Sequence, residues 1–168
     1  MITAIGEEES EQRRHADLFL NALIEPALKE FGLTVVRADK IGASGMITSQ
    51  VLEHVLRAKL AIVDLSFHNP NAFYEMALRH ACGLPIVQIT RKCDKAPFEV
   101  NQVRTVVVDT SDIYTLVPKL ETYRSEIATT TRRVMIFVLP FLTEQRLRRV
   151  EHGVVCASSR EVRFVVLE

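Results

Sequence analysis

Short apolar runs alternate along the chain with longer amphipathic stretches, in the rhythm of βαβ units. Five runs are short enough for strands, and they cover residues 1–5, 33–38, 60–65, 85–90 and 103–109. The run LAIVDL at 60–65 is almost continuously apolar, which is typical of a parallel strand buried on both faces. The rhythm therefore predicts an α/β fold built on a parallel sheet.

The stretches between these runs have helical periodicity. We expect helices over residues 10–31, 46–58, 70–82 and 112–127. Pro26 predicts a kink or break in the first, and Gly32 stands where its C-cap belongs. Asn69 is placed to cap the third helix, with Pro70 at its first position. Together these elements favour a flavodoxin-like three-layer sandwich whose five-stranded parallel sheet has the order 2-1-3-4-5.

The rhythm stops near residue 130. The remaining sequence contains the apolar run VMIFVLPFL, the cluster RLRR at 146–149 and the ending EVRFVVLE. We interpret residues 1–130 as one α/β domain and residues 131–168 as an irregular C-terminal extension that forms an edge strand or an oligomer contact.

Composition narrows the class of protein. The 168 residues, 48% of them hydrophobic and 25% charged, suit one compact domain. Lys+Arg 21 equals Asp+Glu 21, which gives no support for a nucleic-acid or membrane partner and favours self-association. The three cysteines lack CxxC spacing, which argues against a zinc site or disulfide framework. With no signal peptide and no apolar run of about 20 residues, we expect a cytoplasmic protein.

Polar residues follow the predicted strands. Ligands of open α/β sheets bind outside the carboxyl ends of the strands, so these residues form a candidate binding rim. In chain order, the rim holds Gly6 with the acidic loop after it, Arg37 to Lys40, Asp64 to Asn71, Thr90 and Arg91, and Asp109 to Ser111.

Glu75 is the sharpest candidate for chemistry. It lies within about two turns of a helix start, where the amide dipoles favour a carboxylate. An ionised carboxylate can attack the anomeric carbon of a sugar or stabilise an oxocarbenium-like transition state. The plainer interpretation is an ion pair with Arg79, four residues later, and spacing alone favours it. Asp64 also has two interpretations. In the functional one it orients a substrate hydroxyl or protonates a leaving base; in the structural one it caps the loop that follows the strand.

The neighbouring polar residues also have both a ligand-binding and a structural interpretation. Asn69 and Asn71 bind ribose hydroxyls or cap the helix; Tyr74 stacks on a base or joins the core. His68 is a candidate acid–base residue, and Ser44, in the glycine-containing loop at 41–45, is placed to offer an amide to a phosphate. No Ser/His/Asp or metal-binding arrangement stands out, so we predict no metal and no cofactor.

One segment resembles a known family. A strand ending in Asp-Leu, then NPNAFYEMALRHA and GLPIVQI, resembles the nucleoside 2-deoxyribosyltransferase-like superfamily, and most strongly its TIR-like bacterial nucleotide-binding branch. The opening ITAIGEEESEQRRHAD, then VVRADKIGASGMIT and APFEVNQVRTVVVD, are similar to that branch as well. The likeness covers about residues 1–128.

The resemblance implies an N-glycosidic reaction. Glu75 matches the family's glutamate, which attacks the sugar in the transferases and serves nicotinamide–ribose cleavage in TIR-type NAD hydrolases. It implies a nucleoside, nucleotide or NAD-like ligand and a homodimer. Asp64 then assists the leaving group or a ribose hydroxyl. The substrate-binding set is Gly6, Arg37, Asp39, Ser44, His68, Asn69, Asn71 and Tyr74.

Two other classes compete with an enzyme. A non-catalytic nucleotide-binding or signalling module would use the same groove to sense its ligand. A receiver-like domain has the same strand order, and Glu7, Glu8 and Asp64 match its acidic residues. That class also expects a lysine after the fifth strand, where this chain has Asp109. The receiver interpretation therefore ranks third.

Overall fold

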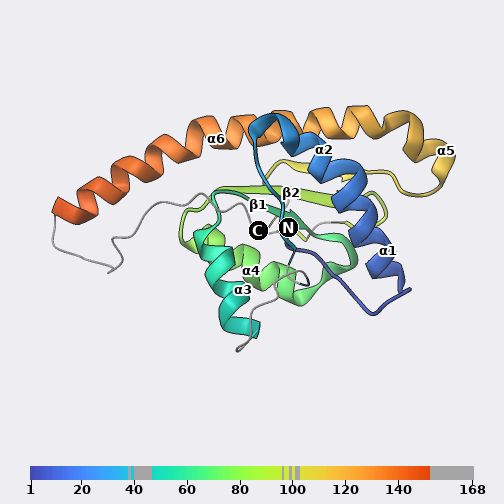
Figure 1. The fold of residues 1–168 in the computed structure, drawn as a ribbon, viewed down its shortest axis with the longest axis horizontal. Helices are drawn as coiled ribbons and strands as arrows, with labels where there is room; N and C mark the ends of the chain where they lie inside the picture. Colours follow the sequence, from blue (N-terminus) through green and yellow to red (C-terminus); the bar gives the residue numbers. More distant parts are fainter. Residues whose placement is uncertain (38, 40–46, 96, 99, 101–102, 152–168) are drawn as a thin grey trace.

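A three-stranded parallel sheet forms the centre of the fold (Figure 1). The structure, a computed structural model, describes residues 1–37, 39, 47–95, 97, 98, 100 and 103–151. The strands are β1 (Ala61–Asp64), β2 (Ile86–Arg91) and β3 (Thr105–Val108), in the order β1-β2-β3. Their registers pair Ala61 with Ile86 and Gln88 with Thr105. The predicted α/β class and the parallel sheet are confirmed, and the arrangement is compatible with a flavodoxin-like fold.

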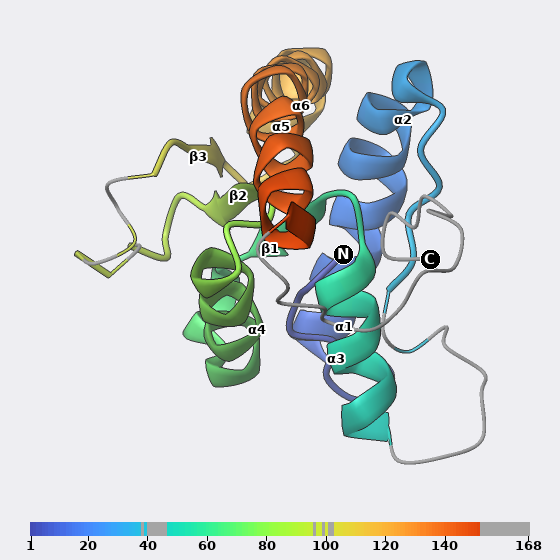
Figure 2. The same ribbon diagram turned by 90° about the vertical axis from the view of Figure 1, so that its left-hand side faces the viewer.

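Helices cover both faces of this sheet, as Figures 1 and 2 show. The first layer contains α1 (Glu11–Leu18), a π-helical segment (Phe19–Ile24), α2 (Glu25–Leu28) and α6 (Leu120–Glu151). The second layer contains α3 (Ile47–Arg57) and α4 (Pro70–Ala81). Shorter elements are 3₁₀ turns at Lys29–Phe31, Ser66–His68 and Val117–Lys119, and α5 (Ile113–Leu116).

Two hydrophobic cores follow from the alternation of side chains along β1. Ile62 belongs to the core under α1, α2 and α6, together with Phe19 and Ile127. Ala61 and Val63 point to the opposite face and join the core with α3 and α4. Because β1 buries every side chain, it is apolar up to its last residue, Asp64, which explains the nearly continuous apolar run that predicted it.

The prediction of five strands is wrong for the described residues. Ile2 forms an isolated parallel bridge with Val63, and the Met1 amino group donates to the carbonyl oxygen of Val36. Residues 1–5 thus lie beside β1 and next to residues 33–37, as the order 2-1-3-4-5 requires, but neither segment forms a ladder. The apolar pattern indicates burial, which Met1, Ile2, Ala4 and Val35 show, but it does not indicate that their backbones pair.

Pro26 does not break the first helix. The π-helical segment Phe19–Ile24 directly precedes α2, in which Pro26 is near the first position. Because proline has no amide hydrogen, it cannot bond the carbonyl of Ala22 four residues earlier. That oxygen accepts a hydrogen bond of 2.7 Å from Nε of Arg124 on α6. Gly32 ends the helical run in the left-handed conformation, at φ 62°, as predicted.

The predicted boundary at residue 130 falls inside α6, which runs unbroken for 32 residues. No glycine or proline interrupts residues 119–139, so the helix passes through the first part of the apolar run that was expected as an edge strand. The edge strand is therefore wrong for residues 131–151, whereas the oligomer contact stays a prediction. Residues 152–168 lie outside the described residues. No helix in the described part of the chain is long and apolar enough to cross a membrane.

Arg79 of α4 is fully buried and ties the second layer to the sheet. Its guanidinium donates to the carbonyl oxygens of Val55, of Ala58 at 3.1 Å and of Pro85 at 2.8 Å. Burial lowers the pKa of Arg79 to about 10, so the group remains charged at neutral pH. Arg79 therefore acts as a connector between α3, α4 and the start of β2.

Replacing Arg79 with methionine should lower the free energy of unfolding by about 3 kcal/mol or more, because the carbonyl oxygens would stay buried without donors. Urea denaturation measures this change. The matched control is Arg57→Met, at a position on α3 whose exposed guanidinium pairs with Glu53. Equal effects of the two substitutions would contradict the connecting role of Arg79.

Candidate functional site

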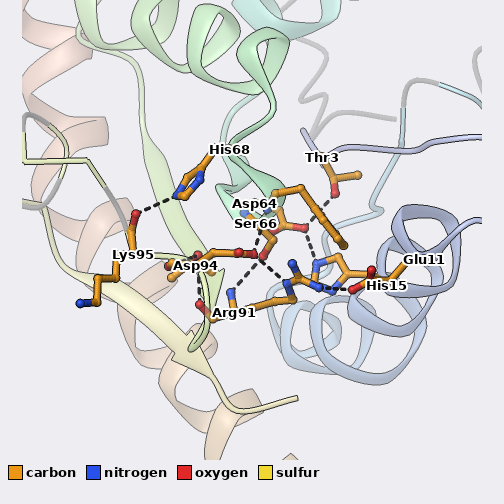
Figure 3. A network of polar contacts seen from close by, with 11 residues as sticks. Thr3, Glu11, His15, Asp64, Ser66, His68, Arg91, Asp94 and Lys95 are labelled. Atoms are coloured by element: carbon orange, nitrogen blue, oxygen red, sulfur yellow. Dashed lines mark hydrogen bonds and ion pairs between the residues drawn. The ribbon is translucent and has the colours of Figure 1, made fainter. Parts of the chain in front are cut away.

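Asp64 stands at the carboxyl end of β1, and its carboxylate is only 1% exposed. Oδ2 accepts from the Thr3 hydroxyl at 2.8 Å and lies 2.8 Å from Nε2 of His15. Oδ1 accepts from the Ser66 amide at 3.0 Å. The predicted capping of the loop after β1 is therefore present. The same carboxylate also joins the N-terminal segment and α1 to the sheet (Figure 3).

His15 reaches Asp64 from α1 and is itself buried. Its ring lies 3.9 Å from the Phe19 ring and meets the Phe67 ring edge-on at 5.1 Å, both between centroids. These apolar walls exclude water from the contact between His15 and Asp64, which strengthens it.

The loop after β1 is held in an uncommon conformation. Phe67 and His68 both have positive φ, 60° and 49°, which is rare for side chains of this size. The Phe67 amide donates to Asp94 at 2.9 Å, and the Arg91 guanidinium lies 3.6 Å from the centre of the Phe67 ring. Strained backbone of this kind persists only where its surroundings fix it, and it is concentrated at functional sites.

Arg91, at the end of β2, and Asp94 connect the contacts of Asp64 and of the loop after β1 into one polar network. Nε of Arg91 donates to Asp94 at 2.7 Å, and Nη1 of Arg91 lies 2.5 Å from the Glu11 carboxylate on α1. Burial disfavours the charge of Asp94, but the hydrogen bonds from Arg91 and the Phe67 amide hold its pKa below the usual range.

Glu75 is half-buried on α4, one turn and a half from the helix start. Burial raises its pKa, and the Met1 amino group partly offsets this effect. The alternative pair of Glu75 with Arg79 is absent among the ion pairs of the described residues, because the Arg79 guanidinium is turned to backbone carbonyls. Tyr74 beside it is 57% exposed, so it does not belong to the core.

The other candidates near α4 have structural partners. Asn69 caps α4 by accepting from the amides of Asn71 at 2.9 Å and Ala72 at 3.3 Å, as predicted. The Asn71 side chain is exposed. Nε2 of His68 lies 2.8 Å from the carbonyl oxygen of Lys95.

The candidates after the first two predicted strands are separate from this network. Arg37 is buried and makes a bidentate pair with Asp39, at 2.7 and 2.8 Å, and an ion pair with Asp17; the Asp39 hydrogen bond raises its pKa. Gly6 turns the chain toward α1 at φ 67°, where a Cβ would collide with the Ser10 hydroxyl. Ser44 lies outside the described residues.

A surface cavity of about 620 Å³ lies against α1 and the ends of β2 and β3. Its charged lining combines three basic residues with two carboxylates, and it consists of Arg14, Arg91, Lys92, Glu11 and Asp109. Thr110 and Ser111, which follow β3, add two hydroxyls. Arg91, Thr110 and Ser111 belong to the predicted rim, but Glu75 and Tyr74 do not line this cavity.

Comparison of the chain with protein-family models, with curated proteins and with solved structures found no match. The resemblance to the deoxyribosyltransferase-like superfamily therefore stays a prediction, and the site is argued from geometry alone. Within the described residues, no three His, Cys, Asp or Glu side chains are grouped so that they hold a metal ion.

Sequence reasoning missed four members of the network: Thr3, Glu11, His15 and Asp94. Glu11 and His15 lie in the polar stretch EQRRHAD, whose pattern shows a helix but not which polar residue turns inward. Their spacing of four residues, which places both on one helix face toward the sheet edge, was the one available signal.

Replacing Asp64 with asparagine should destabilise the fold by about 1–3 kcal/mol. In one orientation the new NH₂ group faces the Ser66 amide, which can only donate. In the other it stands where Thr3 and His15 met a carboxylate oxygen, and both must then act as acceptors. Chemical denaturation measures the loss, with Asp112→Asn as control, because Asp112 is an exposed helix cap at which asparagine serves equally well. An unchanged free energy of unfolding in Asp64→Asn would show that the three contacts are dispensable.

Proposed function

We propose that the chain cleaves or transfers the N-glycosidic bond of a nucleoside, nucleotide or NAD-like ligand, with Glu75 as the nucleophile. The observation that supports this proposal is the state of Glu75: its carboxyl is half-buried and free of the Arg79 pair that spacing favoured. A desolvated carboxylate is a stronger nucleophile than a solvated one.

The chemistry follows the two-step course of retaining glycosyl transfer. The Glu75 carboxylate attacks the anomeric carbon as the carbon–nitrogen bond breaks, and the bonding electrons leave with the base. The base of a neutral nucleoside takes up a proton from water, whereas nicotinamide leaves an NAD-like ligand as a neutral ring without one. Water or a second base then attacks the same carbon and releases Glu75. The exposed ring of Tyr74 offers a surface on which a base stacks.

Asp64 has a positioning role in this proposal. Its carboxylate is buried and accepts hydrogen bonds on both oxygens, so it holds the loop before α4 and is not poised to protonate a base. No step is assigned to Asn69 or His68, whose polar groups already have partners.

The second candidate is a non-catalytic module that binds a nucleotide at the same place. It is favoured by the engagement of Asp64 and His68, because the expelled base of a nucleoside needs a proton and these two groups are held by the fold. In that case Glu75 would contact the ligand without attacking it.

Incubation with NAD and with a panel of nucleosides should release free base, detected by chromatography. Glu75→Gln should lower kcat by at least about 10³-fold, because an amide cannot act as the nucleophile. Glu53→Gln on α3 is the control, since it removes an exposed carboxylate that pairs with Arg57. Retained binding without base release across the panel would favour the module, and full activity in Glu75→Gln would exclude Glu75 as nucleophile.

The rate should also depend on pH in a stated direction. Because burial raises the pKa of Glu75, its reactive ionised form disappears as pH falls through that raised value. We expect kcat/KM to rise with pH and to level off at a higher pH than an exposed carboxyl would give. A profile that falls over the same range would mean that Glu75 acts as an acid.

A further inference from the structure

Three basic residues and two hydroxyl residues line the cavity beside α1, together with the carboxylates of Glu11 and Asp109, which pair with Arg91 and Lys92. Arg14 comes from the helix, Arg91 and Lys92 from the end of β2, and Thr110 and Ser111 from the segment after β3. The cavity thus lies where the carboxyl ends of parallel strands present ligands with polar groups. Its size of about 620 Å³ is within the usual range for small-molecule sites.

Arg91 is the best-fixed cation of this cavity. Its side chain is 13% exposed, Nε bonds Asp94 at 2.7 Å, and its guanidinium plane lies over Phe67 at 3.6 Å. These two contacts hold one edge and one face of the guanidinium, and its Nη1 atom is directed toward Glu11. A guanidinium fixed in this way binds an anion with little further loss of conformational entropy.

Glu11 is the partner of the Nη1 end of Arg91. The Glu11 carboxylate lies 2.5 Å from Nη1 of Arg91 and its side chain is 68% exposed, so this ion pair is weak and exchangeable. Asp94, at 15% exposure, is the permanent partner on the other edge. Lys92 is 67% exposed and reaches Asp109 from the same rim, so it too can turn to an incoming anion.

We propose that this cavity binds a small molecule through a phosphate monoester, which displaces Glu11 from Arg91. A phosphate fits the donors better than a carboxylate does, because its three terminal oxygens accept together from a guanidinium, an ammonium and hydroxyls. The site is distinct from Glu75, which does not line the cavity, and the proposal does not rest on the proposed function.

Isothermal titration calorimetry of the full chain with ribose 5-phosphate tests the proposal, with ribose and inorganic phosphate as separate titrants at constant ionic strength. Saturable binding of ribose 5-phosphate at millimolar concentration, and none of ribose, is expected. Binding of inorganic phosphate as tight as that of the ester would assign the site to the free anion and overturn the small-molecule ligand. No binding of either phosphate would overturn the proposal entirely.

Two substitutions should shift the affinity in opposite directions. Arg91→Gln should weaken binding at least about tenfold, because it removes the fixed donor. Glu11→Gln should tighten binding about two- to fivefold, since it removes a competing charge from an exposed ion pair. Arg57→Gln, the same change on α3, should leave the affinity unchanged.

The Glu11 substitution keeps the test decisive if Arg91→Gln disturbs the loop around Phe67. Weaker or unchanged binding in Glu11→Gln would overturn the displacement of Glu11, whatever Arg91→Gln does. Since none of these variants touches Glu75, loss of phosphate binding and loss of base release are separate outcomes.

Discussion

The buried carboxylate of Asp64 is the constraint on which the sheet edge depends. A charge removed from water is tolerated only when hydrogen bonds replace its hydration, and Thr3, His15 and Ser66 supply them from three separate segments. The N-terminal segment, α1 and the loop after β1 must therefore be in place together. This requirement couples the strained conformation of Phe67 to the helix that carries Glu11 and His15, and so fixes the position of Arg91.

Much of the fold was predictable, because strands buried on both faces and amphipathic helices leave clear patterns. The runs at 60–65, 85–90 and 103–109 became strands, and α3 and α4 began and ended within a residue or two of their expected bounds. The failures share a cause. The apolar runs expected as the first two strands indicate burial, but a β-ladder also needs extended backbones that lie in hydrogen-bonding register. After residue 130, an apolar β-branched run continued a helix that had already formed.

The site was predictable only in part. Position at a strand end identified Asp64 and Arg91, since parallel strands bring their carboxyl ends to one edge. The ion pair of Glu75 with Arg79 that spacing favoured is wrong. Spacing shows that two residues share a helix face, but it does not show whether that face is exposed to solvent or buried. Arg79 faces the carbonyls of three other segments, which no local pattern contains. His15 contacts Asp64, 49 residues away, and Asp94 accepts from the Phe67 amide, 27 residues away, in addition to its local ion pair with Arg91.

The proline in the first helix and the arginine on α6 form a unit with an evolutionary consequence. Pro26 leaves the Ala22 oxygen without its helical donor, and Arg124 satisfies that oxygen from 102 residues away. With an ordinary residue at 26, a helical amide would also reach this oxygen, and the bond from Arg124 would no longer replace a missing donor. Positions 26 and 124 should therefore covary among related sequences, and their joint presence would mark chains in which the long helix docks as it does here.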